Sequence, residues 1–227
     1  MSHQLRRRSF LASAVAAPAS KPLAFAAIAD VHHGLMPDAH ARLERFFEAV
    51  QQRQPDFVVQ LGDFCHPVAE AGGFLKTWHS YRGAKHNVLG NHDMDFGAKA
   101  DIMDRLEMNR AYYSFDAGGF HFVILDCNYL HREGRFTDFA HGNYFGQSDY
   151  RDWVSQDQVE WLKADLAASR LPGIVFTHQP VQGYWDLPAP ERRANVRGVF
   201  SRANRRRSGS VVACLSGHEH VDAHRCA

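Results

Sequence analysis

The sequence predicts an α/β domain, and three of its features support this prediction. From residue 23 onward, short apolar runs alternate with amphipathic segments that have the period of a helix. Polar residues of the types that bind metals stand directly after several of the apolar runs. The 227 residues are enough for one large core, and no linker-like stretch divides them into two domains.

The apolar runs predict seven strands. The first run is followed by Asp30, and the next two are followed by Gly62-Asp63 and Gly90-Asn91. A glycine pair at positions 118 and 119 separates two further runs, which predicts a hairpin. The predicted strands cover residues 23–29, 56–61, 86–89, 112–116, 120–126, 173–177 and 210–215.

Helical periodicity marks the segments between these strands. Between residues 43 and 50, four apolar side chains recur at i, i+3, i+4 and i+7, which places them on one face of a helix. Ser155, with Gln158 three residues later, predicts a helix start closed by a capping box. Residues 127–154 lack periodicity, and we expect them to form a long loop over a site. The predicted helices cover residues 38–53, 68–81, 97–108, a segment that starts at 155, and 190–206.

The net charge of +1 and the ordinary composition give no sign of a nucleic-acid-binding surface. No apolar run is long enough to span a bilayer, so we expect no stable membrane insertion. Histidine is unusually frequent, with 15 residues, and it is the commonest metal ligand in proteins. The composition therefore favours a metal site and gives no sign of a nucleic-acid partner.

The first 19 residues are expected to lie outside the fold. A basic N-terminal segment precedes a short apolar stretch, and Ala17-Pro18-Ala19 has the small-x-small pattern of a cleavage site. The run Arg7-Arg8-Ser9-Phe10-Leu11 resembles a twin-arginine export signal, although Arg6 stands where that signal usually has Ser or Thr. Residues 1–19 are therefore expected to engage the twin-arginine export machinery, leaving a periplasmic or secreted domain over residues 21–227. A disordered basic tail is the alternative.

The four cysteines show no C-x-x-C spacing. Most of them follow or lie in apolar, strand-like runs, where a thiol behaves as a small hydrophobic side chain. A disulfide remains the alternative in an exported protein. The four residues are Cys65, Cys127, Cys214 and Cys226.

Potential metal ligands recur at one structural position. Asp30, Asp63, Asn91, His178 and His218 each lie just beyond the end of a predicted strand. Ligands of α/β sheets bind outside the carboxyl ends of the strands, so these side chains are expected to meet at one edge. Asp30 and His32 are spaced i, i+2, as are His218 and His220. This spacing would place both side chains of a pair on one side of an extended segment.

Five motifs follow one another along the chain, namely Asp30-Val31-His32, Gly62-Asp63, Gly90-Asn91-His92-Asp93, His178 and Gly217-His218-Glu219-His220. Together they resemble the calcineurin-like metallophosphoesterase family, from residue 24 to the end of the chain. Each motif alone is weak, but five motifs in the family's order are specific. The resemblance implies a sandwich of two mixed β-sheets flanked by helices. Since the chain stops seven residues after His220, we expect it to lack the last strands of that fold.

The resemblance implies two divalent metal ions, which could be Mn, Fe or Zn, with a hydroxide bridging them as the nucleophile. Two dications, two carboxylates and one hydroxide sum to about +1, so the site would attract an anionic phosphate. The first ion would take Asp30, His32, Asp63 and His220. The second ion would take Asp63, Asn91, His178 and His218.

The resemblance also assigns His92 as the acid that protonates the leaving group, with Asp93 holding its ring by a hydrogen bond. The implied function is hydrolysis of a small phosphorylated substrate, either a monoester or a diester. The alternative is a non-catalytic metal-binding module on the same fold.

Several other residues have open interpretations. His33 is either a ligand, a substrate contact or a plain loop histidine, and His66 either faces the cleft or lies exposed in a loop. His121 alternates with apolar residues and is expected to be structural. Seven arginines between residues 192 and 207 favour a solvated helix face over an anion-binding patch. The aromatic residues of the long loop either line a substrate pocket or pin the loop to the domain.

Overall fold

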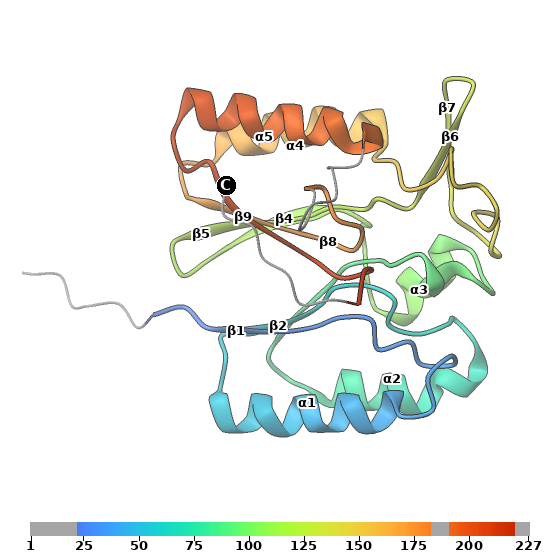
Figure 1. The fold of residues 1–227 in the computed structure, drawn as a ribbon. Helices are drawn as coiled ribbons and strands as arrows, with labels where there is room; N and C mark the ends of the chain where they lie inside the picture. The colour runs from blue at the N-terminus through green and yellow to red at the C-terminus, as the bar shows by residue number, and fades with distance from the viewer. Residues whose placement is uncertain (1–21, 183–190, 221–227) are drawn as a thin grey trace, which may run out of the picture.

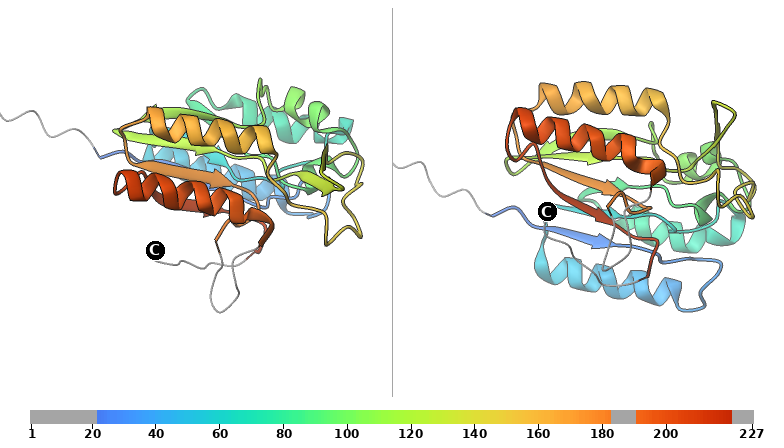
Figure 2. Two further views of the ribbon diagram at one scale, coloured as in Figure 1. Left: turned by 90° about the horizontal axis from the view of Figure 1, so that it is seen from above. Right: turned by 45° about the horizontal axis from the view of Figure 1, so that its top comes forward.

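The computed structural model describes residues 22–182 and 191–220. Two β-sheets lie face to face, and each is covered on its outer side by a pair of helices (Figure 1). The turned views show the same four layers, with the two helix pairs on opposite sides of the molecule (Figure 2). This architecture confirms the predicted α/β sandwich of sheets flanked by helices. No helix of the described segments is long and apolar enough to cross a membrane.

The first sheet has three parallel strands in the order β1-β2-β3. Parallel strands need a long crossover, and here two helices provide it on the outer face of the sheet. We expected this sheet to be mixed, but its three described strands are all parallel. Its elements are β1 (Phe25–Ile28), α1 (Ala39–Arg53), β2 (Phe57–Gln60), α2 (Gly72–Ser80) and β3 (Ala84–Asn87), with a 3-10 turn at Ala69–Ala71.

The second sheet is mixed, with strand order β4-β5-β8-β9. The hairpin β4-β5 is antiparallel, as the glycine pair predicted, whereas the next two strands join in parallel. Helices α4 and α5 cover its outer face (Figure 1). Its elements are β4 (Tyr113–Ala117), β5 (Phe120–Ile124), α4 (Gln156–Ala168), β8 (Gly173–Thr177), α5 (Ala194–Arg206) and β9 (Val211–Ser216), with a 3-10 turn at Glu191–Arg193.

The segment that we predicted as one long loop contains an additional antiparallel hairpin, β6 (Tyr129–Arg132) and β7 (Arg135–Asp138). Its strands carry no regular apolar alternation, which is why the sequence did not reveal them. Helix α3 (Lys99–Arg105) is joined to this hairpin by the ammonium of Lys99. That group lies 2.6 Å from carboxylate oxygens of both Asp126 and Asp138.

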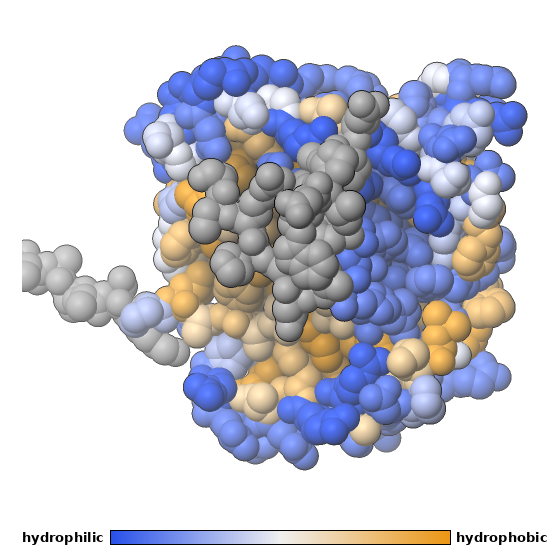
Figure 3. Space-filling model, viewed as in Figure 1, coloured by the Kyte–Doolittle hydropathy of each residue, from blue (hydrophilic) through white to orange (hydrophobic). Residues whose placement is uncertain are grey.

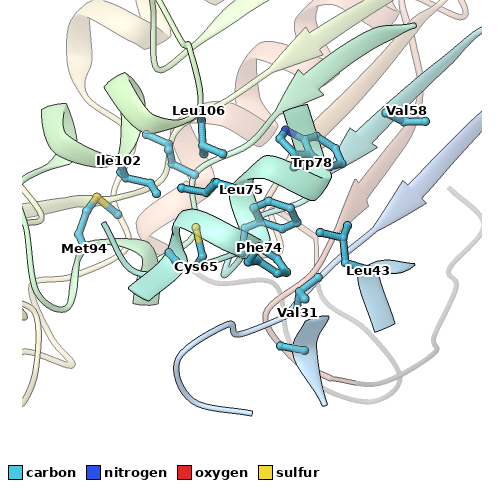
Figure 4. Close-up of a cluster of buried hydrophobic side chains, with 14 of the residues drawn as sticks. Val31, Leu43, Val58, Cys65, Phe74, Leu75, Trp78, Met94, Ile102 and Leu106 are labelled. Carbon is cyan, nitrogen blue, oxygen red and sulfur yellow. The ribbon is translucent and has the colours of Figure 1, made fainter. Parts of the chain in front are cut away.

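The apolar side chains form three clusters that separate the four layers. One cluster lies between α1, α2, α3 and the first sheet (Figure 4). A second lies between the two sheets, and a third lies beneath α4 and α5. Strand β2 supplies two clusters, since Val58 faces the helices while Phe57 and Val59 face the other sheet. Figure 3 shows the resulting surface, with polar residues over the outer helices and apolar residues between the layers.

Two local predictions differ from the structure. Strand β3 begins and ends two residues earlier than expected, so a short connection separates it from the Gly90 motif. The hydroxyl of Ser155 caps α4 by accepting from the backbone N–H of Gln158, as predicted. The side chain of Gln158, however, does not close a capping box. It is fully buried and bonds to both backbone groups of Asp126, linking α4 to the end of β5.

Three of the four cysteines, Cys65, Cys127 and Cys214, are free thiols. Burial raises the pKa of Cys127 to about 11 and that of Cys214 to about 12, so neither is a ready thiolate. Cys226 and the export-signal segment, residues 1–19, lie outside the described residues.

Candidate metal centre

The predicted ligands meet because the carboxyl ends of four parallel strands from two sheets lie at the same end of the molecule. Asp30 and His32 follow β1, and Asp63 follows β2. His178 follows β8 directly, and His218 lies two residues beyond β9. The connections are bonded to one another, since the N–H groups of residues 30 and 32 donate to the carbonyls of residues 62 and 63. Sheet topology therefore assembles the site.

Asp30, His32 and His220 form the first group of ligands, with their ligand atoms within 4.8 Å of one another. The Nε2 atoms of His32 and His220 lie 3.0 Å apart, and Nε2 of His220 lies 3.5 Å from Oδ1 of Asp30. Two imidazole nitrogens and a carboxylate that converge in this way match the ligand preferences of a transition-metal dication.

Asp63, His178 and His218 form the second group. Nε2 of His178 lies 3.0 Å from Oδ2 of Asp63 and 3.2 Å from Nδ1 of His218. The same Oδ2 atom lies 3.8 Å from Nε2 of His32, which belongs to the first group. The backbone N–H of His92 donates to the other oxygen of Asp63. One carboxylate oxygen is thus held between the two groups.

His178 is fixed as a ligand by its backbone contact. Its Nδ1–H donates to the carbonyl of Leu61 at 2.8 Å, so Nε2 faces Asp63 without a proton in the metal-binding form. This contact needs glycine at position 62. A Cβ on Gly62 would lie 2.6 Å from Nδ1 of His178, and its φ of +92° also favours glycine.

Asn91 provides the strongest sign that a cation fits here. Its amide Nδ2 donates to the hydroxyl of Tyr144, while its Oδ1 is buried and has no hydrogen-bond partner among the described residues. A buried amide oxygen without a partner costs free energy that a cation would recover. The donor set of imidazoles, carboxylates and one amide oxygen is also what two divalent ions require. The residues present therefore fit the implied metals.

The backbone of the ligands is strained. Five of the seven predicted ligands have a positive φ, although none is glycine. Asp and His tolerate this region better than most residues, but the conformation still costs free energy, and such residues cluster at functional sites. We predicted that the i, i+2 ligands would share one side of an extended segment, and this was wrong. Left-handed turns position them instead, at Asp30, His32, Asp63, His218 and His220.

Charge favours metal binding as well. Burial alone would raise the pKa of Asp63, but His178, His92 and His32 outweigh it and hold that pKa well below its ordinary value. Burial opposes the charged form of His178, yet Asp63 raises its pKa to about 9. Without metal the pair is therefore an imidazolium and a carboxylate, and a metal ion must displace that proton.

His92 stands beside the two groups and is not a member of either. Its ring lies 5.3 Å from that of His32, and its side chain is one-third exposed. Nδ1 of His92 lies 2.8 Å from Oδ2 of Asp95. The hydrogen bond to Asp95 is the main factor that raises the pKa of His92. With Nδ1–H directed at Asp95, the exchangeable proton is on Nε2.

The expected contact between Asp93 and the His92 ring is therefore corrected to Asp95. Asp93 is completely buried and accepts hydrogen bonds from the backbone N–H groups of Phe64, Cys65 and Gly90. Burial and the nearby Asp63 raise its pKa to about 7, although these N–H donors favour its charged form. Asp93 thus holds the loop that carries Asp63 against the loop that carries Asn91.

Asp95 and Tyr144 belong to the site, although the sequence analysis did not identify their roles. The hydroxyl of Tyr144 donates to Oδ1 of Asp95 at 2.5 Å, and His66 lies 3.4 Å from Oδ2. Burial would raise the pKa of Asp95, but its bonds to His66, His92 and Tyr144 lower it to about 2. The available signal was spacing, since residues i and i+3 of a 3-10 turn lie above one another and His92–Met94 forms such a turn.

The structure answers several of the open interpretations. His33 stacks on Phe74 in the core and belongs to neither ligand group. His121 is structural, as expected, and lies within 2.8 Å of both Asp116 and Asp165. The arginine segment is not simply a solvated face. Arg192 and Arg193 donate to backbone carbonyls of residues 148, 151, 152 and 180, which fixes the long loop near the site.

Comparisons with known proteins found solved structures that resemble this chain. Among solved structures, a dimetal phosphatase from Danio rerio matches with a TM-score of 0.67 and 18% identity, over 88% of this chain and 82% of that one. A phosphopantetheinyl hydrolase from Mycobacterium tuberculosis has 16% identity over 88% and 84% of the two chains, with a TM-score of 0.49. A protein of unknown function from Aquifex aeolicus has 16% identity over 90% and 83%, with a TM-score of 0.42. No curated protein sequence matches significantly.

The family comparison covers almost the whole described domain. The model of the calcineurin-like phosphoesterases matches residues 23–222, which include every predicted ligand. The order of the motifs, the two convergent groups of ligands and the match to a dimetal phosphatase fold all agree. This chain therefore belongs to the calcineurin-like phosphoesterase family, the metal-dependent hydrolases of phosphate esters.

Proposed function

We propose that the chain hydrolyses small phosphate esters by a two-metal mechanism in which His92 is the general acid. The observation that carries the proposal is the position of His92. Its ring stands against the first ligand group, its backbone N–H orients Asp63 between the two groups, and Asp95 holds its Nδ1. An acid that is positioned by its own carboxylate, next to two ligand groups, fits ester cleavage better than metal storage.

The geometry supports a role for each side chain in this proposal. Two divalent ions, when bound, would supply Lewis acidity and a nucleophilic hydroxide. Asp63 would serve both ions, and the distances of its Oδ2 atom, 3.0 Å from His178 and 3.8 Å from His32, support this role. His92 would transfer the proton on Nε2 to the departing oxygen, and Asp95 would stabilise the imidazolium form until that transfer.

The test separates proton transfer from metal binding. We expect His92→Asn to keep near-normal metal content, because His92 lies outside both ligand groups. The variant should lose about 10²–10⁴-fold in rate on alkyl esters, whose alkoxides leave poorly without a proton. It should lose much less on p-nitrophenyl esters, whose phenolate leaves as the anion. Parallel losses on both would assign His92 to substrate binding, and loss of metal would make it a ligand.

The same assay tests the alternative of a non-catalytic binding module. Metal-loaded wild-type protein that binds phosphate esters but turns none over would support that alternative.

The cellular setting is part of the proposal and rests on the sequence alone. The Arg7-Arg8-Ser9-Phe10-Leu11 run supports export by the twin-arginine machinery to the periplasm or beyond. Export of a folded protein would let it acquire its metals in the cytoplasm, away from competing tight-binding ions. The balanced net charge supports a small phosphorylated substrate over a nucleic acid.

A further inference from the structure

Among the described residues, most of the strongly exposed large apolar side chains belong to segments that adjoin His32 and His92. Six large apolar side chains of the described segments are highly exposed, and two of them, Tyr150 and Val212, are not part of this gathering. The other four lie on segments that adjoin His32 or His92, and we call them the apolar rim. They are Leu35 (49% exposed), Met36 (49%), Phe96 (63%) and Phe145 (55%).

Contacts connect the apolar rim to the site. The backbone N–H groups of Leu35 and Met36 both donate to the carbonyl of His32 at 2.9 Å. The ring of Phe96 lies 4.7 Å from the ring of His66, which in turn lies 3.4 Å from Asp95. Single exposed apolar residues need no explanation, but four on segments that adjoin the site, one of them with its ring against His92, indicate a binding surface.

Phe145 is the rim residue whose ring contacts His92, at 6.3 Å between centroids. Its position is fixed by a turn that is bonded to the His92 segment. Gly142 N–H donates to the carbonyl of Met94, and Phe145 N–H donates to the carbonyl of Gly142. The Phe145 ring rests on Gly142, where a Cβ would lie 2.7 Å from two ring carbons. The Phe145 ring is therefore held in a solvent-exposed position beside His92, which indicates that the ring contacts a ligand.

We propose that Phe145, supported by the rest of the apolar rim, stacks on an aromatic leaving group, so that the substrate is a phosphate ester of an aromatic alcohol. This inference rests on the proposed function, because a leaving group must lie within hydrogen-bond reach of the acid His92. A planar ring attached to the ester oxygen would then lie within the 4.5–7 Å at which aromatic rings pack. An aliphatic group would gain less from the flat face of Phe145.

The test compares two esters whose leaving groups have similar acidity, phenyl phosphate and hexafluoroisopropyl phosphate. Phe145→Ala should lose about three- to tenfold in kcat/KM on the phenyl ester, mainly through KM, and less than about twofold on the alkyl ester. Phe145→Trp should restore the loss. Tyr150→Ala is the matched control, since Tyr150 is an exposed aromatic residue whose ring contacts Arg132. Tyr150→Ala should leave kcat/KM on both esters unchanged.

A binding measurement separates this inference from the proposed function. Benzylphosphonate, which cannot be hydrolysed, should bind Phe145→Ala about three- to tenfold more weakly than wild type, whereas methylphosphonate should bind both equally. If the wild type hydrolyses neither ester, the proposed function fails, and the two phosphonates still decide whether the rim binds aromatic groups. Equal losses of Phe145→Ala on both esters, or an unchanged affinity for benzylphosphonate, would overturn the inference.

Discussion

Asp95 gives the most direct test of how the site operates, because it touches His92 without being a predicted ligand. Asp95→Asn keeps the size of the side chain and removes its charge. Three groups depend on that charge: Nδ1 of His92 at 2.8 Å, the hydroxyl of Tyr144 at 2.5 Å and Nε2 of His66 at 3.4 Å. The substitution should therefore weaken the imidazolium form of His92 and its orientation.

The magnitude follows from the strength of one charge-assisted hydrogen bond. Such bonds contribute about 1.5–3 kcal/mol, and each 1.36 kcal/mol is a tenfold change in rate. We therefore expect kcat/KM on alkyl esters to fall about 10–10²-fold. Asp95 raises the pKa of His92, so in the variant His92 should lose its proton at a lower pH than in the wild type. The alkaline limb of its pH–rate profile should move to lower pH.

The assay is the pH dependence of kcat/KM on an alkyl ester, with metal content measured in parallel. Asp104→Asn is the matched control, because it removes the same charge from an exposed position in α3. Asp104→Asn should leave the pH dependence of kcat/KM unchanged. An Asp95→Asn protein with wild-type rate and profile would refute the positioning role. A loss of metal comparable with that of a ligand variant would show that Asp95 belongs to the metal centre.

Three further outcomes are expected. Asp63→Asn should abolish activity and lower metal content at both sites, because one carboxylate oxygen lies between the two ligand groups. Two ions bound per chain with wild-type affinity would contradict this role. For His121, burial opposes the charged form but hydrogen bonds with two aspartates raise the pKa above its ordinary 6.5. Its contribution to the free energy of unfolding should thus be complete below about pH 6.5 and fade as pH rises through the raised pKa. Denaturant melts should show His121→Gln destabilised more at pH 6 than at pH 9, and an equal loss at both would refute this. Changing Arg7 and Arg8 to Lys should retain active protein in the cytoplasm of the native host, as fractionation would show, and unchanged export would refute the signal.

The sequence alone determined the layout of the fold and the order of the ligands. Strands with near-continuous apolar character and helices with a 3.6-residue period are local patterns, and both kinds of element appear close to their predicted bounds. Asp30, Asp63 and His178 could be identified because strand ends are also visible locally, and the topology of parallel strands brings those ends together.

Tertiary structure alone decided which side chains touch. Asp93 and Asp95 are equally plausible partners for His92 in the sequence, but the 3-10 turn stacks positions 92 and 95 and directs Asp93 into the core. Tyr144 reaches the same site from a loop more than 50 positions later. The left-handed backbone of Asp30 and His32 was equally invisible, because it depends on contacts with the neighbouring connection at Asp63. Periodicity reports which face of an element is buried, whereas the partners of a polar side chain are set by segments that are distant in sequence.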